Sequence, residues 1–182
     1  MHRISAALLA LALAFSLAAC CGAPKEPKGE TPPEEMLDAA QLCDTLDAYC
    51  AEVDESLAPM IGGIDTAKNY TGMQLDYVLN DTMGAALDAK DTIRAIHEAT
   101  KEIAAQTEDT EGLEEYLDTF KDLLGCALTY ADKGKEYCKN PTQENADAYT
   151  HSSDVYLASK LNYAGEQLEY LLNYYTIEEL PE

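Results

Sequence analysis

The sequence predicts an all-α protein built as an antiparallel, up-down-up-down four-helix bundle. Helix-forming residues dominate, no stretch alternates apolar and polar residues as a strand does, and four segments carry apolar residues at helical spacing. Short connections between these segments make each helix an antiparallel neighbour of the next. Tandem helical hairpins of a repeat protein are the alternative, which is disfavoured because no internal repeat of about 30 to 45 residues is visible.

The first helix is expected to end close to Pro59. Its apolar residues alternate steps of three and four, the spacing of a seam that packs on other helices. These residues are Cys43, Leu46, Cys50, Val53, Leu57 and Met60. Pro59 and the pair Gly62-Gly63 then predict the end of this helix and a first connection over residues 59–65.

The second helical segment, residues 66–106, lacks a single apolar stripe. Placing its residues at intervals of about 100° puts Tyr70 and Tyr77 on one side and Ile93 about 120° away. Gly84 is also a weak point within a helix. We therefore predict that the second helix is broken or kinked between Tyr70 and Gly84.

The third helix has the clearest apolar face of the four. Its members are Leu113, Tyr116, Leu117, Phe120, Leu124, Ala127, Leu128 and Ala131. Asp109 or Thr110 is the expected N-cap, after a connection over residues 107–109. Asn140-Pro141-Thr142 should form the next connection, because proline suits the first position of a helix and not its interior.

Two apolar stripes compete for the buried side of the fourth helix, which should end near Tyr175. The expected core face consists of Leu157, Leu161, Ala164, Leu168, Leu171 and Leu172. The second stripe consists of Tyr149, Tyr156, Tyr163 and Tyr170, which recur every seven residues and, with Tyr174, lie about 120° from the first. We expect these rings either to roof the seams of the bundle with their hydroxyls in water or to form an exposed surface for a partner helix, peptide or glycan.

The beginning of the chain has the layout of an exported protein. A short basic start and an apolar run over residues 4–17 are typical of a secretory signal peptide, and the run is short for a membrane-spanning helix. The tetrapeptide Leu17-Ala18-Ala19-Cys20 resembles the lipobox of bacterial lipoproteins. This resemblance implies removal of residues 1–19, acylation of Cys20, and a lipid anchor in the bacterial cell membrane with the protein on the extracytoplasmic side. Ordinary cleavage near Ala18 and an uncleaved apolar anchor are the alternatives.

Behind the leader we expect a tether, residues 20–35, and a helical bundle domain, residues 36–182. The tether contains four of the seven prolines and favours extended polyproline II geometry. Loss of the leader removes Arg3 and no acid, which leaves 11 basic against 34 acidic residues and a net charge of −23. Such a surface repels nucleic acid and anionic lipid headgroups, so neither is expected as a partner.

The sequence contains no recognised catalytic motif and no cofactor signature. C-x-x-C and Glu-x-x-His pairs are missing, so the usual zinc, thioredoxin-like, haem and di-iron signatures are not found. Asp147, His151 and Asp154 share a helix face and could hold a divalent ion weakly, but in so acidic a chain a solvated face is the simpler interpretation. Cys43, Cys50, Cys126 and Cys138 are expected to be free thiols, with at most one interhelical disulfide.

These features favour a membrane-anchored, non-enzymatic binding or interaction module with a protein, peptide or glycan as its partner. The alternative is a carrier of a cofactor or of a metal such as Cu(I), which thiolate and thioether ligands select. Its candidate ligands are Cys43, Cys50, Cys138, Met60, Met73 and Met83. An enzyme with an unfamiliar site is a third possibility.

Overall fold

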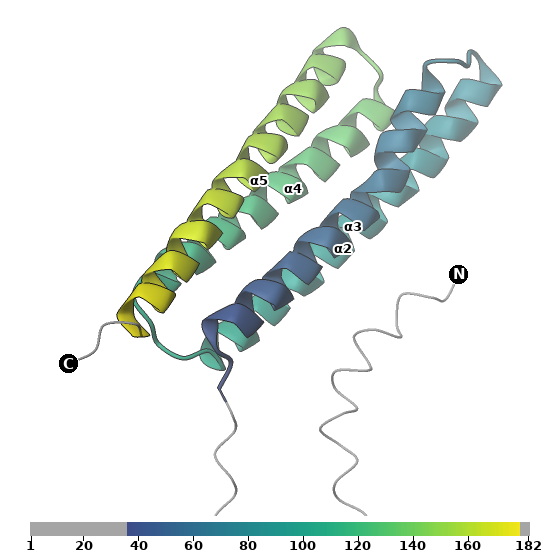
Figure 1. Ribbon diagram of the computed structural model, residues 1–182. Helices are drawn as coiled ribbons and strands as arrows, with labels where there is room; N and C mark the ends of the chain where they lie inside the picture. The colour runs from purple at the N-terminus through teal and green to yellow at the C-terminus, as the bar shows by residue number, and fades with distance from the viewer. Residues whose placement is uncertain (1–35, 179–182) are drawn as a thin grey trace, which may run out of the picture. The chain divides into compact units, whose positions relative to one another are not determined.

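The computed structural model describes residues 36–178, with side chains as far as Tyr175, and this part of the chain is an all-α bundle (Figure 1). Its helices are α2 (Ala39–Ala67), α3 (Met73–Ala105), α4 (Leu113–Lys139) and α5 (Gln143–Glu178). The all-α prediction is therefore confirmed. The predicted signal peptide, the lipidation site Cys20 and the tether lie outside the described residues.

The helices form two hairpins that lie side by side, α2 with α3 and α4 with α5 (Figure 1). Within the first hairpin, Gly63 near the end of α2 lies against Thr82 in the first half of α3. Leu37, just before α2, pairs in an isolated β-bridge with Thr107, just after α3. Contacts in this order mean that α2 and α3 run in opposite directions. None of the helices within residues 36–178 combines the length and the apolarity that a membrane span needs.

The α2 helix continues to Ala67, so the connection predicted over residues 59–65 is wrong. The helix starts with a capping box, in which the Asp38 side chain accepts from the Gln41 N–H and the Gln41 side chain accepts from the Asp38 N–H. Pro59 lies on the exposed side of α2, where the carbonyl that it leaves without a helical donor can reach water.

Gly63 is a packing residue and not a helix stop. A Cβ atom at this position would lie 2.1 Å from Oγ1 and 2.9 Å from Cβ of Thr82, which is closer than two atoms can approach. The lack of a side chain therefore lets α2 and α3 come close together. The chain turns only at residues 68–72, where Gly72 has a φ of +59°, a conformation that glycine adopts without strain.

The kink predicted between Tyr70 and Gly84 is not confirmed. The turn occupies the beginning of that window, and α3 is continuous from Met73 to Ala105. The irregular apolar pattern has another cause. Met73 is 87% exposed and Tyr77 is exposed as well, so the first turns of α3 extend beyond the core and need not share its apolar stripe.

The two remaining connections differ in how well the sequence predicted them. The connection before α4 spans residues 106–112, and α4 starts after Gly112 without a side-chain cap, so Asp109 and Thr110 are not N-caps. The hydroxyl of Thr110 instead shares a hydrogen bond of 2.7 Å with that of Tyr170. The connection over residues 140–142 is confirmed, since α4 ends at Lys139 and α5 begins at Gln143.

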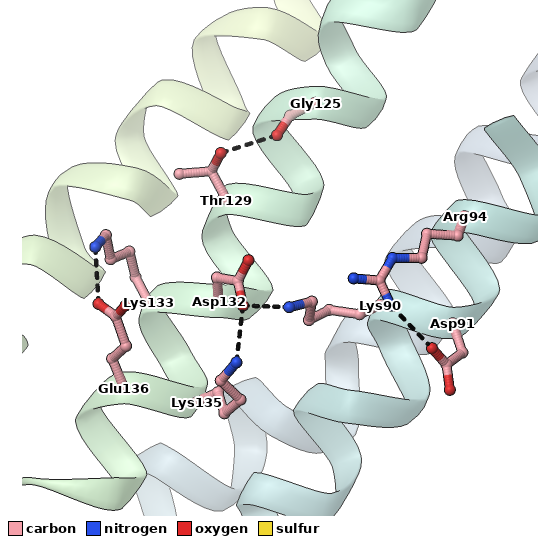
Figure 2. A network of polar contacts seen from close by, with 9 residues as sticks. All are labelled: Lys90, Asp91, Arg94, Gly125, Thr129, Asp132, Lys133, Lys135 and Glu136. Atoms are coloured by element: carbon pink, nitrogen blue, oxygen red, sulfur yellow. Dashed lines mark hydrogen bonds and ion pairs between the residues drawn. The ribbon is translucent and has the colours of Figure 1, made fainter.

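A partly buried ion pair joins the two hairpins between α3 and α4 (Figure 2). Lys90 is 7% exposed and donates to Asp132 of α4, which also accepts from Lys135 at 3.1 Å. Burial by itself raises the pKa of Asp132, but the hydrogen bonds from both lysines outweigh it, and the pKa is lowered. Because a buried ammonium group needs a partner, this pair sets the register of one hairpin on the other.

The two adjacent glycines of α2 provide a test of this packing. Gly63→Ala should lower the free energy of unfolding by about 1–3 kcal/mol, because the added methyl group overpacks the contact with Thr82. Gly62→Ala is the matched control: a Cβ there meets nothing within 4 Å, so the change should raise stability by roughly 0.5–1 kcal/mol. Urea unfolding followed by circular dichroism measures both. Equal effects at the two positions would contradict the close approach of α2 and α3.

Candidate functional site

The heptad tyrosines of α5 point into the bundle. Tyr156 and Tyr163 are each 4% exposed, Tyr170 is 2% exposed, and Tyr149 is half-buried. Both predictions for these rings are therefore wrong: they neither form an exposed docking surface nor roof the seams of the bundle with their hydroxyls in water. Tyr174, the remaining member of the predicted surface, is half-buried too. The rings belong to the core, which the sequence assigned to the leucines of the same helix.

The α5 rings stack on rings of α4. The centroid of Tyr116 lies 5.5 Å from that of Tyr163 and 5.0 Å from that of Tyr170, both in stacked geometry. About four helical turns further along α4, Tyr130 stacks on Tyr149 at 5.1 Å. Aromatic pairs at such distances add to the gain from burial, so this aromatic layer holds α5 to α4. Because partners later in α4 meet residues earlier in α5, the two helices run in opposite directions.

Each buried hydroxyl of this layer has a hydrogen-bond partner. Tyr163 shares a bond of 2.8 Å with Tyr116, and Tyr130 shares one of 2.9 Å with Tyr149. Within residues 36–178, no buried side-chain nitrogen or oxygen lacks a partner. This matters because a buried phenol without a partner would cost about 1–3 kcal/mol.

Two carboxylates of α2 complete the layer. Tyr163 donates to Asp47 at 3.1 Å, and Gln167 donates to the same carboxylate at 3.0 Å. Tyr156 donates to Asp54 at 2.9 Å, and Lys160 pairs with the other oxygen of Asp54. Asp47 and Asp54 are seven residues apart, as are Tyr163 and Tyr156. The spacing of the acceptors on α2 therefore equals the spacing of the donors on α5.

Burial raises the pKa of the phenols in this layer well above its usual range. The group includes Tyr116, Tyr149, Tyr156, Tyr163 and Tyr170. Desolvation is the largest cause for each of them, because a phenolate in this environment would lose its hydration. The tyrosine layer therefore consists of neutral, hydrogen-bonded groups, which suits a structural role.

The candidate metal ligands are distributed over three helices, with Met60 buried in the second half of α2. Cys43 and Cys50 lie in the first half of α2, Cys138 lies in the last turn of α4, and Met73 is exposed at the start of α3, while Met83 is half-buried on α3. No group of three or more His, Cys, Asp or Glu side chains within residues 36–178 is arranged to hold a metal ion.

The four cysteines of the bundle are free thiols, as expected. Burial raises the pKa of Cys50 to about 12 and that of Cys138 to about 11, and it also raises the pKa of Cys43. Since the thiolate is the form that attacks electrophiles and binds metals, these environments favour inert thiols. Asp147, His151 and Asp154 are all exposed on α5, in keeping with a solvated face.

A shallow cleft of about 620 Å³ lies between α4 and α5. Its polar lining includes Lys121, Cys126, Lys133 and His151. Both lysines are already paired with acids of their own helix, Lys121 with Asp118 and Lys133 with Glu136, and Figure 2 shows the second pair. The charges of the lysines are therefore largely satisfied within α4.

The outer face of α5 carries the leucines that were predicted to form its core face, so that prediction is wrong. We call this surface the leucine face; it consists of Leu157, Leu161, Ala164, Leu168 and Leu172, all of them exposed. The exposed fractions of Leu157, Leu161 and Leu168 are 56%, 77% and 60%. Leu171 is half-buried at the edge. A helix of a monomeric bundle normally turns such a stripe inward, so this face is the candidate functional site.

Sequence reasoning missed the leucine face because it ranked leucine above tyrosine as a core residue. A signal for the correct orientation was present in α2. Asp47 and Asp54 follow the apolar seam residues Cys43 and Cys50 by four positions each, which places two acceptors at the rim of that seam. Paired with tyrosines at the same spacing of seven, they indicate which face of α5 turns inward.

Comparison with protein-family models, with curated proteins and with solved structures finds no match for this chain.

The raised pKa values predict a loss of stability at alkaline pH. In the unfolded chain tyrosine ionises near pH 10, whereas the buried phenols stay protonated, so above about pH 10 the unfolded chain binds fewer protons. The free energy of unfolding should then fall by up to about 1.4 kcal/mol per pH unit for each such tyrosine. Below pH 10 this contribution is fully present.

Urea midpoints measured between about pH 8 and 11 test this expectation, because the midpoint follows the free energy of unfolding. Tyr163→Phe removes one of the buried phenols, so its stability should fall less steeply with pH than that of the natural protein. Identical slopes for the two proteins would show that Tyr163 ionises as readily in the fold as outside it.

Proposed function

We propose that this protein is a lipid-anchored, extracytoplasmic interaction module of a bacterial cell membrane, without enzymatic activity. The observation that carries the proposal is the leucine face of α5. Single exposed leucines are common, but a continuous stripe on one helix is typical of a surface that another molecule covers. From Leu157 to Leu172 the face is about 24 Å long, which is the scale of a helix docking against a helix.

The chemistry of the interior supports a non-enzymatic role. The phenols of the tyrosine layer and three of the four thiols have raised pKa values because they are buried, which disfavours the charged forms that act as bases or nucleophiles. The polar groups of the layer are used to join α5 to α2 and α4. We therefore expect a partner to contact the outer surface of this part of the chain.

A second exposed apolar group lies at the turn between α2 and α3, where Tyr70, Met73 and Tyr77 are exposed. It is interrupted by the exposed acid Asp76 and is built from a turn and the first residues of one helix. The leucine face is longer and lies on one regular helix, so it is the better candidate for docking.

The lipid anchor has a test with a matched control in the adjacent residue. Cys20→Ser should abolish labelling of the full-length protein by an alkyne fatty acid and release it from the membrane fraction, because only a thiol at the lipobox position accepts the diacylglyceryl group. Cys21→Ser should leave both labelling and membrane recovery unchanged. Retained labelling of the Cys20→Ser variant would contradict the proposal that Cys20 carries the lipid anchor.

A charged substitution in the leucine face, compared with a charged substitution on α3, tests whether this face binds a partner. Leu161→Glu should dissolve the complex that the full-length protein forms in its membrane, because a carboxylate cannot be buried unpaired in an apolar contact. Ala95→Glu, on an exposed position of α3, should leave that complex intact. Molar mass after detergent extraction, measured by light scattering, reports the complex, and unchanged thermal unfolding shows that both variants fold. If the natural protein runs as a single chain without any partner, the proposed function fails.

A further inference from the structure

The leucine face is nearly free of charge in a protein that carries 34 acidic residues. Between Val155 and Leu168 the only charged residues are Lys160 and Glu166, and both are half-buried. Lys160 lies over the α2 side of the helix, where it pairs with Asp54. A stretch of more than three helical turns without an exposed charge therefore faces outward from a strongly acidic molecule.

The spacing of the face is that of a coiled-coil seam. Leu157, Leu161, Ala164 and Leu168 follow one another by steps of four, three and four, which continue the pattern of a and d positions. An identical helix offers the same knobs and holes, so the face is complementary to itself. The small side chain of Ala164 at the centre lets two backbones come close.

The rim of the face argues against a basic partner. A cationic helix would be recognised by acids that flank the apolar stripe, as in the e and g positions of a coiled coil. The residues that flank the face are Ala158 and Gly165 on one side and Ser153, Lys160 and Gln167 on the other. None of them is acidic, and Lys160 and Gln167 are held by Asp54 and Asp47 of α2. Two acidic copies of this chain repel each other over most of their surface, but between Leu157 and Leu168 they can meet without bringing exposed carboxylates together.

The positions of the start of α2 and the end of α5 determine how the α5 helices of two anchored copies would be oriented. The connection between α3 and α4 contacts Leu37 before α2 through the Thr107 bridge and contacts Tyr170 near the end of α5 through Thr110. The start of α2 and the end of α5 therefore lie at the same end of the bundle (Figure 1). Chains anchored through residues 20–35 in one membrane would present their α5 helices with the same polarity.

We propose that the leucine face binds the leucine face of a second copy of this chain, with the two α5 helices parallel about a twofold axis. This rests on the proposed function, which supplies the anchor and the docking role of α5. In this arrangement Ala164 lies opposite Ala164 of the other copy, and Leu157 lies opposite Leu157. Such a twofold interface uses the same patch on both subunits and closes after two copies.

Site-specific photo-cross-linking of the full-length protein in its own membrane tests the proposal. Benzoylphenylalanine is placed at Ala164, at Leu157, or at the control position Ala95, all of which are exposed, so that folding is maintained. The expected product from Ala164 and Leu157 has twice the mass of one chain and is several-fold more abundant than any product from Ala95. Peptide mapping should join position 157 to the neighbourhood of residue 157 in the other copy.

Each other outcome overturns the proposal in a distinguishable way. A product between Ala164 and a different protein would exclude the second copy while leaving the interaction module standing. Joining of position 157 to residues 168–175 of the other copy would mean antiparallel helices and would exclude the shared polarity. No product above that of Ala95 would overturn both the second copy and the proposed function.

Discussion

The hydrogen bonds of the buried tyrosine hydroxyls determine how α5 sits in the bundle. A tyrosine ring buries about 150–250 Å², more than a leucine, but its hydroxyl must find a partner in the interior. Tyr116 and Tyr130 of α4 and Asp47 and Asp54 of α2 provide partners at the spacing of the α5 rings. Once these bonds form, the rotation of α5 about its own axis is set, and the opposite face has to point outward.

This orientation explains why the fold exposes leucines that it could have buried. Full burial of one leucine is worth about 1.5–3 kcal/mol, so leaving several outside is a substantial loss for an isolated chain. The rings on the other face compensate through a larger buried area and stacking on α4. The remaining apolar surface is then available to a second molecule, which connects the polar interior of the bundle to its proposed role as an interaction module.

Polar contacts also join the two hairpins. Asp54 binds Tyr156 and Lys160 between α2 and α5, while Lys90 binds Asp132 between α3 and α4. Polar groups in these positions favour one register, because a shifted register would bury them without partners. The buried phenols and the carboxylates of Asp47, Asp54 and Asp132 thus help to specify how the four helices assemble.

The sequence by itself determined the all-α class, most of the core of α4 and the last connection at residues 140–142, because helical periodicity and local turn residues are encoded in neighbouring positions. The end of α2 could not be predicted, since the role of Gly63 depends on Thr82, which belongs to another helix. The buried face of α5 was likewise decided by its packing on α2 and α4. Both of its stripes are apolar, and only the acceptors on α2 and α4 distinguish the tyrosines that turn inward from the leucines that remain outside.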